Sequence, residues 1–127
     1  NLMARYPSEA VHNQAREAAL DTVREAMKAT ELRLRQLAAE AKPLQVEAEF
    51  YEGKPLPPAL KSAIDANAVA VEAQHAASAQ QAAELGRLNR LYDAELGRLR
   101  QLWAGSVPGS LGPVAANGTV PATLTKP

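Results

Sequence analysis

The sequence predicts an all-α fold: a long antiparallel coiled-coil hairpin of two helices, followed by an irregular tail. Composition is the first observation, because only 4% of the residues are aromatic and the abundant residues, Ala, Leu, Glu, Arg and Gln, favour helices. The second is a pair of stretches whose apolar residues recur at alternating spacings of three and four, the period of a two-stranded seam. The third is a Gly- and Pro-rich segment between the two stretches, which predicts a turn.

The first helix is expected from about residue 8 to residue 52. Ser8 is placed to cap its N-terminus, and Glu9 follows in the first turn, where the helix dipole favours negative charge. Pro43 interrupts the stretch, but the apolar stripe keeps its phase on both sides, so we expect a kinked and continuous helix. The stripe consists of Leu20, Val23, Met27, Thr30, Leu34, Leu37, Ala41, Leu44, Ala48 and Tyr51.

Residues 53–58 predict the turn. Gly53 suits the left-handed position that ends a helix, Pro55 prevents continuation, and Pro57 or Pro58 suits the first turn of the next helix. A connection of about six residues makes the two helices neighbours that run antiparallel.

The second helix is expected from about residue 58 to residue 104. Its predicted stripe is Ile64, Ala68, Val71, His75, Ser78, Ala82, Leu85, Asn89, Tyr92, Leu96, Leu99 and Trp103, widened by Leu60, Leu88 and Leu91. Folding about the turn predicts these neighbours: Leu44 and Val46 near Ile64, Met27 near Leu85, Leu20 near Tyr92, and Tyr6 or Val11 near Leu99 and Trp103. Residues 1–104 therefore form the hairpin, after a short lead-in over residues 1–7.

Residues 105–127 contain many Gly and Pro residues and a single charge, which predicts a flexible tail or linker. The chain begins with Asn rather than Met, so we expect a fragment or a processed product.

Charge and chemistry exclude several classes of function. Fourteen basic residues balance fourteen acidic ones and the two signs are interleaved, which argues against a nucleic-acid partner. Cysteine is absent, and no apolar run approaches the ~20 residues that span a bilayer. His12 and His75 are the only histidines, and no spacing predicts a metal site, a phosphate loop or a nucleophile. We therefore expect no catalytic residue, cofactor, metal or small-molecule substrate, and a structural role for His75 on the seam.

Residues 66–83 predict an interaction face. Glu72 is their only charge, and nine of the eighteen are Ala. A two-helix seam buries little, so a second hairpin forming a four-helix assembly would supply the missing burial. The candidate face is Ala66, Ala70, Ala73, Ala77, Gln80 and Ala83, with Trp103 as a further candidate. The alternative for the Ala-rich segment is a solvated helix without a partner. The alternative for Trp103 is that it closes the open end of the hairpin against Tyr6 or Val11. The arginines at 87, 90, 98 and 100 are expected to form a solvated face with weak ion pairs rather than a phosphate-binding stripe.

Three segments resemble a recurrent pattern in uncharacterised proteobacterial envelope proteins, in which a helical hairpin follows a small N-terminal domain of unknown function. The segments are residues 2–20, with LMARYPSEA and AREAAL; residues 53–60, GKPLPPAL; and residues 92–96, YDAEL. The resemblance implies a bacterial, periplasmic or envelope origin and an N-terminal domain before residue 1. It implies no activity.

The sequence as a whole predicts a non-enzymatic structural or scaffolding module. Its expected partner is another copy of the chain or another helical protein. The alternative is a chaperone-like or adaptor module that binds a client protein through its arms or its tail.

Overall fold

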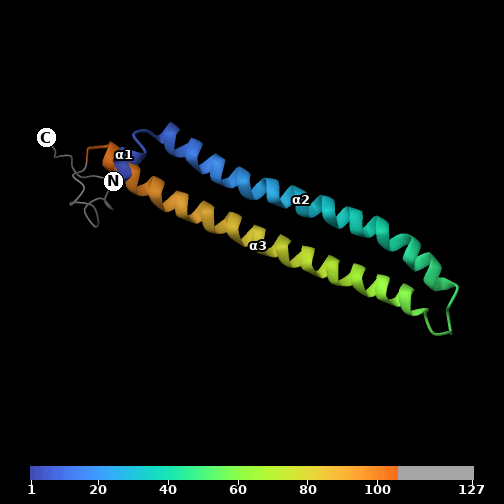
Figure 1. The fold of residues 1–127 in the computed structure, drawn as a ribbon. Coiled ribbons are helices and arrows are strands. Elements are labelled where there is room, and N and C mark those ends of the chain that lie inside the picture. The colour runs from blue at the N-terminus through green and yellow to red at the C-terminus, as the bar shows by residue number, and fades with distance from the viewer. Residues whose placement is uncertain (106–127) are drawn as a thin grey trace. The chain divides into compact units, whose positions relative to one another are not determined.

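The computed structural model describes residues 1–105, and within them it contains three helices and no strand: α1 (Leu2–Arg5), α2 (Glu9–Glu49) and α3 (Pro58–Trp103) (Figure 1). The all-α helical hairpin is confirmed, because α2 and α3 pack against each other. The tail expected over residues 105–127 lies, apart from Gly105, outside the described residues.

The chain divides into two compact units. The first comprises Asn1–Leu20 and the chain from Arg87 onward, and the second comprises Asp21–Gly86. We call them the terminal unit and the turn unit. Both long helices contribute to both units, and the two are described in turn.

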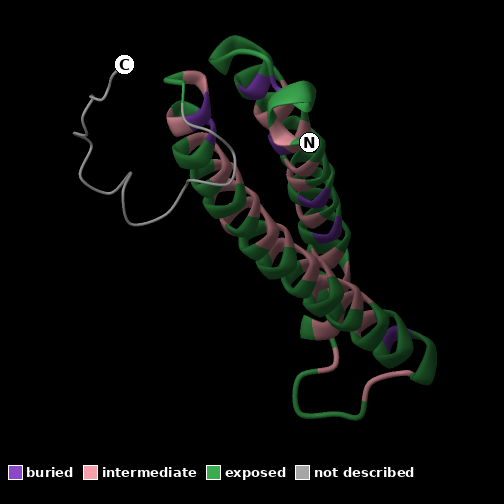
Figure 2. Cartoon of the chain, turned by 90° about the vertical axis from the view of Figure 1, so that its left-hand side faces the viewer, coloured by how far each residue is buried: buried purple, intermediate pink, exposed green. Residues whose placement is uncertain are grey.

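In the turn unit, the shielded face of α2 is the predicted stripe. Among residues 21–49, only the stripe positions are shielded from solvent, and every residue between them is exposed (Figure 2). Leu37 and Thr30 are the most buried of them. The complete shielded set is Val23, Met27, Thr30, Leu34, Leu37, Ala41, Leu44 and Ala48.

The shielded face of α3 differs from the predicted one. Ala68, His75 and Ala82 were expected on the seam and are exposed, so that prediction was wrong. The three-and-four spacing instead continues through Leu60, Ile64, Asn67, Val71, Gln74, Ser78, Gln81 and Leu85, all of which are shielded. The amides Asn67, Gln74 and Gln81 therefore hold the seam positions that the sequence analysis assigned to Ala68, His75 and Ala82.

Local signals fix the ends of the helices. The Ser8 hydroxyl accepts a hydrogen bond from the Val11 N–H (3.2 Å), which is the predicted N-cap. α2 passes through Pro43 without a break and ends at Glu49 rather than near residue 52. Gly53 adopts a left-handed conformation (φ +77°), as predicted. α3 begins at Pro58, where a missing N–H costs no helical hydrogen bond.

The terminal unit contains one element that the sequence analysis did not predict. α1 is a single turn, capped by the Asn1 side chain, which accepts a hydrogen bond from the Ala4 N–H. It brings Tyr6 against Leu99 and Leu102, which form the buried cluster of this unit. Trp103 packs against the cluster, and its indole N–H donates to the Tyr6 carbonyl (3.0 Å).

Leu99 is fully buried (0% exposed), whereas Leu91 on the same helix and in the same unit is 45% exposed. We therefore expect Leu99→Ala to lower the free energy of unfolding by about 2–5 kcal/mol, through lost burial and the cavity left behind. Leu91→Ala is the matched control and should change it by about 0.5 kcal/mol or less. Urea unfolding followed by circular dichroism measures both, and equal losses would contradict the described packing.

Candidate functional site

The described residues offer little acid–base or metal chemistry. Within residues 1–105, no group of three His, Asp or Glu side chains is arranged to hold a metal ion. His12 belongs to the terminal unit and His75 to the turn unit, where His75 is exposed. Two other kinds of feature stand out instead, namely polar contacts between α2 and α3 and uncharged outer surfaces on both helices.

His12 is the most enclosed polar residue of the terminal unit, with 1% of its side chain exposed. Its ring lies edge-on to Tyr6 (4.8 Å between centroids) and 5.3 Å from the ring of Tyr92. Its Nε2 lies 3.2 Å from Oε1 of Glu95. Burial raises the pKa of Tyr92, and the neighbouring Tyr6 and Glu95 add to the shift. Because the imidazole is closed to solvent, its contacts are those of a packing residue.

Two arginines join the helices of the same unit. Arg16 forms an ion pair with Asp93 (2.7 Å) and donates to the side-chain oxygen of Asn89 (2.9 Å). The Arg100 guanidinium donates to both carboxylate oxygens of Glu9, at 3.2 and 3.0 Å. The sequence analysis missed these pairs because it matched charges along one helix, whereas the antiparallel arrangement matches them across two.

The hydrogen bond from Arg100 lowers the pKa of Glu9 below its ordinary value. We expect Arg100→Gln to raise the pKa of Glu9 toward that value, because the charged donor is lost. The ion pair stabilises the folded chain fully at pH values above the ordinary pKa of a glutamate in the unfolded chain. This stabilisation is lost as the pH falls through the lowered pKa that Glu9 has in the folded chain. An NMR titration of the Glu9 carboxyl carbon measures the shift, with Arg98→Gln, on the same helix, as the control. An unchanged Glu9 titration in Arg100→Gln would show that the two residues do not pair in solution.

In the turn unit, side-chain amides of α3 reach polar atoms of α2. Asn67 donates to the Leu37 carbonyl (3.0 Å), and Gln81 donates to the Thr30 hydroxyl (2.9 Å). The Thr30 hydroxyl in turn donates to the Ala26 carbonyl (3.1 Å). The amide oxygen of Gln81 is buried and has no hydrogen-bond partner. Polar residues inside a helix seam reduce stability and fix the register of the two helices.

This arrangement predicts an asymmetry between two substitutions. Thr30→Val removes the acceptor of the Gln81 amide N–H, and we expect a loss of about 1–3 kcal/mol of unfolding free energy. Gln81→Leu leaves the Thr30 hydroxyl bonded to the Ala26 carbonyl and should be neutral or stabilising. The double variant should recover most of the Thr30→Val loss, since neither polar group is then left unsatisfied. Urea unfolding of the four proteins tests this, and strictly additive effects would contradict it.

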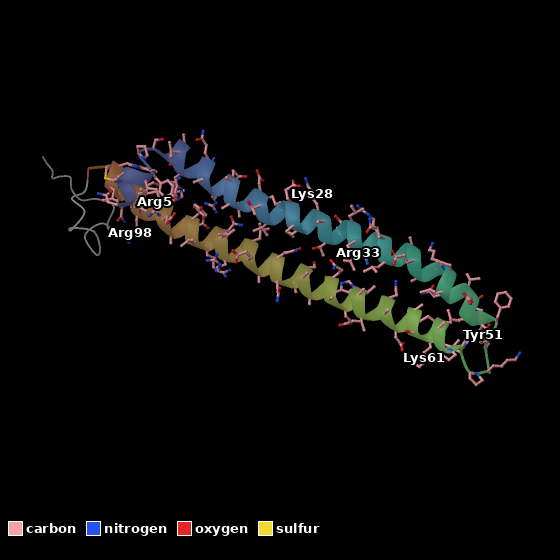
Figure 3. All side chains as sticks on the ribbon, viewed as in Figure 1. Arg5, Lys28, Arg33, Tyr51, Lys61 and Arg98 are labelled. Atoms are coloured by element: carbon pink, nitrogen blue, oxygen red, sulfur yellow. The ribbon has the colours of Figure 1, made fainter. Side chains whose placement is uncertain are left out.

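Uncharged stripes lie on the outer faces of both helices in the turn unit. Ion-pairing side chains such as Lys28 flank them (Figure 3). Leu32 and Val46 on α2, and Phe50 directly after its last residue, are 50%, 56% and 77% exposed. The α2 outer stripe is Ala29, Leu32, Gln36, Ala39, Pro43, Val46 and Phe50, and the α3 outer stripe is Ser62, Ala66, Val69, Ala73, Ala76, Gln80 and Ala83, all of them exposed. The sequence analysis did not identify the α2 outer stripe, although its spacing of three and four and its lack of charge are visible in the sequence.

The predicted interaction face agrees with the α3 outer stripe only in part. Ala66, Ala73, Gln80 and Ala83 are exposed, whereas Ala70 and Ala77 are half-buried toward α2. Trp103 lies in the terminal unit and is engaged with Tyr6, as the closing role predicts.

A hollow of about 430 Å³ opens beside the seam of the turn unit, where α3 carries alanines. Arg33 and Glu40, both exposed, flank it and lie 3.5 Å apart. Its remaining lining is Leu37, Leu44, Ala63, Ala66, Asn67 and Ala70. The hollow presents no buried charge that would orient a small ligand.

None of the helices within residues 1–105 has the length and hydropathy needed to span a membrane. Comparison of the chain with protein-family models, with curated proteins and with solved structures found no match. The functional conclusion therefore depends on the geometry of the described residues.

Proposed function

We propose that this chain is a non-enzymatic scaffolding module, a coiled-coil hairpin that associates with further copies of itself through the outer faces of its turn unit. The observation that carries the proposal is the pair of uncharged outer stripes. A helix face exposed to water usually intersperses charges, and contiguous exposed apolar surface marks an interaction site.

The small amount of burial within one chain supports the same proposal. Eight of the 105 described residues are buried: Tyr6, His12, Leu20, Thr30, Leu37, Leu60, Leu99 and Leu102. Each helix buries one stripe and leaves the rest of its surface to solvent. Covering the outer stripes would remove apolar surface from water, and the resulting stabilisation of the folded chain would grow with the logarithm of its concentration.

The distribution of polar groups supports a non-enzymatic role. His12 and Glu95 satisfy each other in a closed environment. Most carboxylates of the turn unit lie on exposed helix faces, where water screens their charge and no enclosed pocket surrounds them.

A second function, an adaptor that binds a different helical protein or a client, is favoured by one observation. Phe50 follows the last residue of α2 and is 77% exposed, and aromatic side chains are enriched where proteins bind their partners. In that case the outer stripes would receive a helix of the partner.

Sedimentation velocity of the purified full chain over a wide concentration range tests self-association. We expect a reversible increase in mass with concentration, and we expect Val46→Lys and Ala73→Lys each to weaken it, because each buries a charge in the contact. Gln14→Lys adds the same charge at an exposed site of the terminal unit and is the control. A chain that stays monomeric at every concentration would contradict self-association and leave the adaptor function as the better account.

A further inference from the structure

We propose that the turn units of successive copies stack side by side, with the α2 outer stripe of one copy packed antiparallel against the α3 outer stripe of the next. The occupant of the exposed α2 face is thus a second copy of this chain. The inference rests on the proposed self-association and specifies which surfaces meet.

The two stripes lie on different helices of the turn unit, and at 3.6 residues per turn each runs along the side of its helix away from the shared seam. Only Ala66, which borders the hollow beside the seam, departs from this. A contact between the α2 stripe of one copy and the α3 stripe of another therefore leaves one free stripe at each end of the pair. Such a heterologous contact either closes into a ring or continues as an open row.

The side chains of the two stripes are complementary in size. With the helices antiparallel and Ala39 opposite Val69, Leu32 comes opposite Ala76. The other nearest positions are Ala29 with Gln80, Gln36 with Ala73, Pro43 with Ala66, and Val46 with Ser62. Each large side chain thus meets a small one, which allows two helices to approach closely and interdigitate. Phe50, the last residue of the α2 outer stripe, comes opposite the first turn of the neighbouring α3.

The charges that flank the stripes agree with the same register. Arg35 comes opposite Glu72, and Lys42 comes opposite Asp65. On the other flank of α2, Arg33 and Glu40 pair with each other beside the hollow of their own chain (3.5 Å). Opposite charges across an interface select the partner and its register.

Two-fold pairings of like stripes fit less well. If two α2 outer stripes pack antiparallel with their Ala39 residues facing each other, Arg35 comes opposite Lys42 and the two copies of Glu40 lie together. Opposite charges meet only toward the ends of the two stripes. Two α3 outer stripes place the two copies of Glu72 together and join only small side chains. Like charges that face each other oppose association. The pairing of α2 with α3 avoids every such contact.

The size of the contact predicts a weak association. A stripe of about 21 residues is roughly 30 Å long, and a helix is about 10 Å wide, so one contact covers on the order of 300 Å² of each copy. Stable interfaces bury about 800 Å² per partner. A single pair is therefore short-lived, and stability grows only because an interior copy of the row uses both of its outer stripes.

Charge reversal on each side separates this arrangement from the alternatives. In sedimentation velocity of the full chain, Arg35→Glu places a second carboxylate opposite Glu72 of the next copy, and Glu72→Lys places an ammonium group opposite Arg35. We expect each variant alone to associate about fivefold more weakly. An equimolar mixture of the two should recover wild-type association, because every contact between the two kinds of chain then joins opposite charges. Lys54→Glu and Glu52→Lys, in the exposed connection between the helices, are the matched controls, and circular dichroism verifies helicity.

The outcomes distinguish the two proposals. Weakening by each variant, with recovery in the mixture, supports the stacking of α2 on α3. Stronger association of Arg35→Glu would overturn it in favour of paired α2 stripes, since the introduced carboxylate would then meet Lys42. No recovery in the mixture, or no effect of either reversal while Val46→Lys still disrupts association, would also overturn the stacking and leave self-association standing. A wild-type chain that never associates would overturn both proposals.

Discussion

The structure depends on one constraint, the seven-residue recurrence of shielded side chains along two antiparallel helices. Leu37 in the turn unit and Leu99 in the terminal unit are almost completely buried, because each lies where the recurrence points one helix at the other. A helix that buries one stripe leaves most of its circumference exposed. The seam therefore determines the fold and also determines which residues remain available to a partner.

Polar residues within the seam keep the two helices in register. The bond from Asn67 to the Leu37 carbonyl and the bond from Gln81 to the Thr30 hydroxyl form together only in one alignment, and a slip by one turn would leave both amides without partners in a shielded position. This alignment also determines the position of the α2 outer stripe relative to the α3 outer stripe along the turn unit. Two contact surfaces carried by different helices keep a constant offset only if neither helix slides.

The predictions from the sequence were correct where the deciding interactions join residues close together in the chain, and wrong or missing where they join distant residues. Ser8, Gly53 and Pro58 were placed correctly because capping and turn formation are decided within a few residues. The stripe of α2 was correct because most of its members are large apolar residues, among them Leu34, Leu37 and Leu44. The stripe of α3 was wrong at Ala68 and Ala82 because Asn67 and Gln81 become suitable for a seam only when polar atoms of α2, the Leu37 carbonyl and the Thr30 hydroxyl, are near them. α1 and the His12–Glu95 contact depend on the folded chain in the same way. The resemblance to envelope proteins stays a prediction, since no finding tests it.

The contact between α2 and α3 along the seam is expected to be stronger than any contact through the outer stripes. Both faces of α2 are free of charge, but the seam carries Leu34, Leu37 and Leu44, whereas the outer stripe includes Ala39 and Pro43. The connection between the helices also keeps the seam partners at a high effective concentration, an advantage that separate chains lack. The seam therefore forms first and within one chain. In the proposed assembly, contacts through the outer stripes would be weaker than the seam and would depend on concentration, as expected of a scaffold that assembles where copies accumulate and separates when they disperse.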